Sequence, residues 1–109
     1  MTCVAYRLHF LHEIQPRKTS EFHDWLLGLK DPRARIAIIK RLTRAINGNF
    51  GDSAGLSNGL SEMRVFVGKG YRIYYTIQNK QLVILLCGGH KGTQKKDIER
   101  AKKLLVELE

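Results

Sequence analysis

The strongest constraint on the fold of this chain is a set of three strand-like segments separated only by short turns. Residues 63–67 (MRVFV) and 71–78 (YRIYYTIQ) alternate so that one face of each segment is apolar, which predicts half-buried strands. Short turns at 68–70 and 79–80 separate them from each other and from the run LVILLC at 82–87. That run is apolar throughout, as expected of a strand covered on both faces. These segments predict a small antiparallel meander.

The sequence on either side of the meander has helical spacing. Apolar residues at 22, 25, 26 and 29 predict a helix capped by Thr19 or Ser20, and Asp31-Pro32 begins a second helix that ends at Asn47-Gly48. The joint between the two is so short that we expect a helical hairpin. A last helix begins with Thr93 as its N-cap. Its predicted buried stripe is Ile98, Ala101, Leu104, Leu105 and Leu108.

The remaining segments complete the predicted topology. Residues 1–12 alternate loosely, as an edge strand does, and residues 47–60 hold four glycines without periodicity, which predicts a loop. The expected order is β-α-α-β-β-β-α. This is an α+β fold in which a helical hairpin and a C-terminal helix pack on a small antiparallel sheet, with helices on one face and part of the other face open. The 109 residues suit a single domain spanning 1–109, with 1–10 as an edge strand or an N-terminal extension.

Charge and composition limit the classes of partner. The chain has 19 Lys and Arg against 10 Asp and Glu, and this excess favours a polyanion: nucleic acid, an anionic membrane face or an acidic protein. No apolar run approaches the ~20 residues of a membrane span, and no signal peptide is recognisable, so we expect a cytoplasmic protein with no membrane partner. Cys3 and Cys87 lie far apart without metal-ligand spacing, so neither a metal nor another cofactor is expected.

Two arginines stand out from the general positive charge. Arg64 and Arg72 fall in neighbouring predicted strands, on the face opposite the apolar set, where two guanidiniums repel unless water or an anion lies between them. Tyr74 shares that face, and an exposed ring there could stack on a base. The segment GGHKGTQ at 88–94 joins the last strand to the last helix. It places the imidazole of His90, a group able to take up or give up a proton, beside the fixed charge of Lys91.

Several motifs together carry a family resemblance over roughly residues 11–107. They are FHDWLLGLKD, GNFGD, SEMR, GKGYRIYY and GGHKGTQKKDI. The chain resembles the RelE/HigB-type toxins of bacterial type II toxin–antitoxin modules, in the branch called addiction module killer proteins. It departs from close relatives at His90, where they usually carry Asp, at Gly92, where they carry Ser, and near Ala54, where Lys is common.

The resemblance implies a RelE-like fold and a small ribonuclease that cleaves mRNA, often on the ribosome, and thereby stops translation. RNA cleavage without metal needs a base for the 2′-OH, cations for the developing phosphorane charge and an acid for the leaving oxygen. We assign the catalytic roles to Arg64, Arg72, His90 and Lys91, the arginines as phosphate stabilisers and the other two as proton-transfer candidates. RNA binding is assigned to Tyr74 by stacking, to Gln94 by orienting the loop or substrate, and to Lys95 through the phosphate backbone.

The same resemblance implies the partners and leaves alternatives open. We expect a cognate helix-turn-helix antitoxin, mRNA that can be ribosome-bound, and operator DNA contacted only through the antitoxin. One alternative is a ParE-type toxin, which shares the fold but inhibits DNA gyrase. Another is a non-catalytic member that only binds antitoxin and operator DNA.

Overall fold

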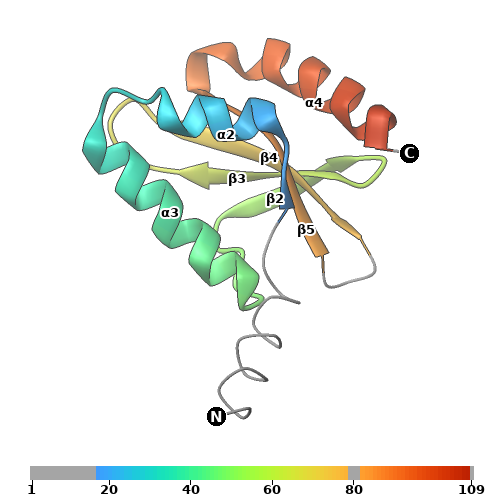
Figure 1. The fold of residues 1–109 in the computed structure, drawn as a ribbon, viewed down its shortest axis with the longest axis horizontal. Helices are drawn as coiled ribbons and strands as arrows, with labels where there is room; N and C mark the ends of the chain where they lie inside the picture. Colours follow the sequence, from blue (N-terminus) through green and yellow to red (C-terminus); the bar gives the residue numbers. More distant parts are fainter. Residues whose placement is uncertain (1–16, 79–81, 109) are drawn as a thin grey trace.

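The computed structural model describes residues 17–78 and 82–108, so the predicted strand within residues 1–12 and the turn at 79–80 lie outside the described residues. None of its helices is both long enough and apolar enough to cross a bilayer. Figure 1 shows the arrangement of the elements. They are β1 (Arg17–Lys18), α2 (Ser20–Leu27), α3 (Pro32–Ile46), β2 (Ser53–Ser57), β3 (Leu60–Val65), β4 (Tyr71–Gln78), β5 (Leu82–His90), the 3₁₀ turn η1 (Lys91–Thr93) and α4 (Gln94–Leu108).

The strands form one mixed five-stranded sheet in the order β1-β5-β4-β3-β2. Strands β2 to β5 are antiparallel neighbours and form the predicted meander with one additional strand. The short β1 adds in parallel to β5, with Arg17 opposite Ile84 and Lys18 opposite Leu85. The α+β class is therefore confirmed, and the sheet has one more strand after the helices than predicted.

The two helices that follow β1 begin at the predicted caps. The Thr19 hydroxyl accepts a hydrogen bond from the Phe22 amide at 3.0 Å, and an Asp31 carboxylate oxygen accepts one from the Arg33 amide at the same distance. Pro32 occupies the first turn of α3, and Asn47 ends the helix. The short joint does not lay the helices side by side along their lengths, because α2 packs mainly on β5 and α3 on β3 (Figure 1).

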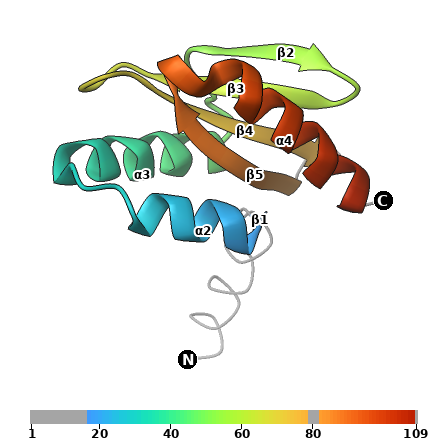
Figure 2. The same ribbon diagram turned by 90° about the horizontal axis from the view of Figure 1, so that it is seen from above.

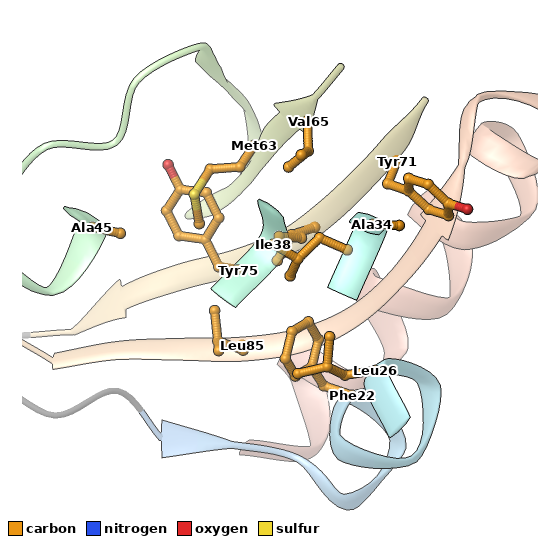
Figure 3. Packing of buried hydrophobic residues seen from close by; sticks show 11 residues of the cluster. Phe22, Leu26, Ala34, Ile38, Ala45, Met63, Val65, Tyr71, Tyr75 and Leu85 are labelled. Atoms are coloured by element: carbon orange, nitrogen blue, oxygen red, sulfur yellow. The ribbon is translucent and has the colours of Figure 1, made fainter. Parts of the chain in front are cut away.

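Helices cover both faces of the sheet, which corrects the expectation that they cover one. Helices α2 and α3 lie on one side and α4 on the other (Figure 2). Alternation along β4 divides the core accordingly. Ile73 and Tyr75 belong to the α2–α3 cluster, in which Figure 3 shows Tyr75. Tyr74 belongs instead to the smaller cluster under α4 with Leu86 and Ala101.

The predicted boundaries differ from the structure at β2 and β5. Strand β2 lies inside the predicted loop, because an edge strand of small and polar residues needs only backbone pairing with β3 and shows no apolar alternation. Strand β5 continues through Gly88 and Gly89 to His90. The final α-helix begins at Gln94, immediately after Thr93 as predicted, and a 3₁₀ turn capped by His90 precedes it.

Gly88 and Gly89 allow a close approach on both faces of β5. A Cβ atom on Gly88 would overlap the ring of Trp25 from α2. A Cβ atom on Gly89 would overlap the Asp97 carboxylate in the first turn of α4, which accepts a hydrogen bond from the Thr93 hydroxyl. These two glycines therefore set how near the helices lie to the end of β5.

We predict that Gly89→Ala destabilises the protein by about 1–3 kcal/mol, because the new methyl group must displace the first turn of α4. Gly55→Ala is the matched control. It also lies in a strand, but a Cβ there meets nothing within 4 Å. Urea unfolding of both variants measures the difference, and equal stabilities would show that α4 does not depend on the bare backbone at Gly89.

Candidate functional site

The two predicted arginines lie directly opposite each other. Arg64 on β3 pairs in register with Arg72 on β4, and both side chains lie on the α4 face of the sheet, as the alternation predicted. Like charges in such a pair repel each other. The sequence analysis expected water or an anion between them, and the structure contains an anion that belongs to the protein.

That anion is Glu62, a buried carboxylate on β3. Its Oε2 atom lies 3.0 Å from Arg72 Nη1 and 3.5 Å from Arg64 Nη1. The Glu62 side chain is only 4% exposed, against 16% for Arg72 and 31% for Arg64. The guanidiniums therefore remain partly open to solvent while the carboxylate that links them does not.

A second carboxylate holds Arg64 from the other side. Asp52 Oδ1 accepts hydrogen bonds from Arg64 Nη2 at 2.9 Å and from Arg64 Nε at 3.2 Å. Arg41 on α3 fixes the surrounding backbone by donating to the carbonyl oxygens of Phe50 and Arg64. Arg64 is thus anchored independently of Glu62. Among the described residues, Arg72 has Glu62 as its sole ion-pair partner.

A pocket of about 370 Å³ opens beside the arginines at the turn between β3 and β4. Two further cations, Lys69 and Lys91, line it, and neither forms an ion pair with a residue in the described ranges. Phe66 also lines the pocket, and its side chain is unusually open for a large apolar group, at 80% exposure. The lining residues are Arg64, Val65, Phe66, Val67, Gly68, Lys69, Gly70, Tyr71, Arg72 and Lys91.

The two predicted proton-transfer residues are placed differently. The Lys91 amide donates to the Gly70 carbonyl at 3.1 Å, which holds the residue at the pocket. His90 pairs with Tyr71, whereas its neighbour Gly89 pairs with Arg72. By strand alternation His90 therefore lies on the opposite face of the sheet from Arg72. Its Nδ1 atom accepts a hydrogen bond from the Gly92 amide at 3.0 Å and caps η1. His90 therefore has a structural role and is absent from the pocket lining.

The residues predicted to bind RNA divide in the same way. Gln94 at the start of α4 reaches the arginine cluster, with its Nε2 atom 3.5 Å from Glu62 Oε1. Lys95 is exposed but lines a different hollow on α4 with Lys96 and Lys103. The structure thus brings Gln94, but not Lys95, to the two arginines.

The expectation that Tyr74 is exposed is wrong. Its side chain is fully buried beneath α4, in contact with the smaller core cluster, so its ring is not available to stack on a base. Burial, followed by the nearby Glu62 charge, raises the pKa of the Tyr74 hydroxyl well above its usual value. Alternation placed Tyr74 on the correct face, but it does not show which part of a face a helix covers.

The described residues offer neither a reactive thiol nor a metal site. Burial raises the pKa of Cys87 to about 12, so its reactive thiolate is scarce at neutral pH. Within residues 17–78 and 82–108, no three His, Cys, Asp or Glu side chains are grouped so that they could hold a metal ion.

Sequence reasoning missed two residues of the site. Glu62 shares the alternation face of Arg64, two positions away, and this spacing was the signal that could have identified it as the anion between the arginines. Phe66 continues the same alternation beyond the end of β3. An aromatic residue at a strand end next to a glycine turn was the available signal for an exposed ring.

The structure and the sequence are similar to known proteins. The fold is that of RelE-like toxins: the chain matches, with a TM-score of 0.57 and 22% identity, a chain in the crystal structure of the toxin–antitoxin complex RelBE2 from Mycobacterium tuberculosis. The match covers 71% of this chain and 96% of the other. An uncharacterized protein of Haemophilus influenzae is 50% identical over 95 residues, which are 87% of this chain and 96% of the relative.

The family model described as Phage derived protein Gp49-like (DUF891) matches residues 24–106. The chain belongs to this family. The matched range contains helix α3, strands β2 to β5, all but the last two residues of α4 and every residue of the pocket.

We predict that Arg72→Ala destabilises the protein by about 3 kcal/mol. It leaves the buried Glu62 carboxylate with only its longer contacts to Arg64 and Gln94, which places the cost at the lower end for a broken buried ion pair. Arg100→Ala is the matched control, since it removes an exposed pair with Glu21 that solvent screens and that should contribute little to stability. Chemical denaturation tests this, and a loss for Arg72→Ala no larger than for the control would mean that Glu62 does not need its partner.

Proposed function

We propose that this protein is the toxin of a toxin–antitoxin module and that it acts as a metal-independent endoribonuclease on mRNA, thereby inhibiting translation. The observation that carries the proposal is the pocket between β3 and β4, where four cations and an exposed aromatic ring meet. Guanidinium and ammonium groups bind phosphate, and an exposed ring can stack on a base. The RelE-like fold and the RelBE2 neighbour add support from outside the site.

The proposed reaction needs only the RNA itself. The ribose 2′-oxygen attacks the adjacent phosphorus and gives its proton to water, the bond from phosphorus to the 5′-oxygen breaks, and that oxygen takes a proton from Lys91 or from water. The products are a 2′,3′-cyclic phosphate and a 5′-hydroxyl. Arg64 and Arg72 bind the phosphate through their exposed edges, and Lys91 stabilises the charge that develops on it or protonates the leaving oxygen. We leave His90 out of this scheme because it does not line the pocket and its Nδ1 caps η1.

The proposal includes the partners expected from the sequence. A cognate antitoxin covers the toxin, mRNA is the substrate either free or on the ribosome, and operator DNA is reached through the antitoxin. The RelBE2 neighbour is itself from a toxin–antitoxin complex, which supports a protein partner of this kind. We place the protein in the cytoplasm, where mRNA and ribosomes are found.

We predict that Lys91→Ala lowers RNA cleavage by about 10²-fold, because it removes a cation from the reacting phosphate. Stability should change little, since Lys91 is exposed and forms no ion pair in the described part of the chain. Purified protein is incubated with an RNA oligomer in the presence of EDTA, and product is quantified. The matched control is Lys102→Ala, an exposed lysine on the far part of α4.

Pulse labelling after induction in cells tests the wider proposal. Rapid loss of amino-acid incorporation supports the ribonuclease. Loss of thymidine incorporation with DNA damage would instead indicate a gyrase inhibitor, and unaffected growth would indicate a non-catalytic member. Wild-type rates of cleavage by the Lys91 variant would remove this residue from the mechanism.

We also predict that Phe66→Ala weakens binding of a non-cleavable 2′-deoxy-substituted RNA analogue about tenfold or more, the effect of losing one stacked base. Val106→Ala, which truncates another exposed apolar side chain, is the control and should bind normally. Fluorescence anisotropy gives both dissociation constants. Equal affinities for the two variants would show that the Phe66 ring does not contact the nucleic acid.

A further inference from the structure

We infer that Glu62 is a positioning residue that holds Arg72 in the orientation needed to bind the scissile phosphate. This inference rests on the proposed function and extends it to a residue that never touches RNA. It concerns a buried carboxylate that contacts side chains from β3, β4 and α4.

The contacts distinguish the two arginines. Asp52 holds Arg64 through two of its nitrogen atoms, whereas Glu62 contacts it at the longer distance of 3.5 Å. Arg72 depends on Glu62, with its Nη1 atom 3.0 Å from the carboxylate. Removing the Glu62 charge should therefore release Arg72 and leave Arg64 in place.

The burial of Glu62 argues against two other roles. A general base must reach the 2′-hydroxyl, and an anion that competes with the phosphate must lie where the phosphate binds. Glu62 is directly opposite the buried Tyr74 and is approached by Gln94 from α4, and it does not line the pocket. The buried carboxylate contacts both arginines, whereas the arginines and not Glu62 line the pocket.

The charges explain why positioning is needed. Arg64 and Arg72 stand in one cross-strand pair, so without a carboxylate between them their repulsion would turn the less anchored side chain outward. Arg72 is that side chain. A guanidinium held in place by a buried acceptor loses little freedom when it binds phosphate, which is the advantage of a preorganised site.

Glu62→Gln tests the inference because it removes the charge and keeps the shape. Coulomb attraction alone predicts that losing a negative charge near the pocket strengthens RNA binding. Positioning predicts instead that kcat falls by about 10²-fold, because the misplaced guanidinium no longer stabilises the charge that develops on the phosphate, while KM and the affinity for a non-cleavable RNA change little. Glu107→Gln on the exposed end of α4 is the matched control and should retain both constants.

A second measurement is independent of activity. The side-chain Nε–H NMR signal of Arg72 should be sharp in the wild-type protein and broadened or shifted in Glu62→Gln, whereas that of Arg100, paired with Glu21, should not change. If Glu62→Gln fails to fold, Glu62→Asp keeps the charge but withdraws it by one methylene, and the same loss of kcat and of the Arg72 signal is expected.

Each outcome decides one of the two ideas. A folded Glu62→Gln protein with wild-type kcat, or with an unchanged Arg72 signal, overturns the positioning role. If wild-type protein cleaves no RNA while the Arg72 signal depends on Glu62, the ribonuclease proposal fails and the positioning of Arg72 stands. In the Glu62→Gln, Gln94→Glu double variant a carboxylate returns to the cluster from α4, and partial recovery of kcat would support the electrostatic origin of the effect.

Discussion

Two like charges face each other across β3 and β4, and buried or half-exposed carboxylates make that arrangement stable. Glu62 contacts both guanidiniums and Asp52 contacts one of them. The pairs compensate the charge of the arginines, while both arginines stay partly exposed and line the pocket. The positive charge of the chain is therefore not simply spread over its surface. At the pocket, two acidic side chains hold the arginine side chains in place.

This arrangement depends on how closely α4 approaches the sheet. The bare backbone at Gly89 lets the first turn of α4 lie against β5, and the same turn carries Gln94 to within 3.5 Å of Glu62. On the opposite face Gly88 accommodates the ring of Trp25. Gly88 and Gly89 thus allow α2 and α4 to approach the last strand from opposite faces, and α4 contributes Gln94 to the arginine cluster.

Local sequence patterns predicted much of the fold but only part of the candidate site. Caps at Thr19 and Asp31 and the shared face of Arg64 and Arg72 are local properties, and the structure confirms them. Alternation assigns a side chain to a face but not to what covers that face, so Tyr74 was expected to be exposed and is buried by α4. For the same reason the role of Glu62 was not predicted, because it depends on contacts with Arg72 on β4 and Gln94 on α4.

The parallel pairing of β1 with β5 has a consequence for how the molecule folds. Arg17 pairs with Ile84, a separation of most of the chain, whereas β2 to β5 join successive neighbours through short turns. Closing a long loop costs more chain entropy than zipping adjacent hairpins, and non-local pairing slows folding. The slow stage should be the return of the amino-terminal segment to the far edge of the sheet, after the hairpins that carry the arginines have already formed.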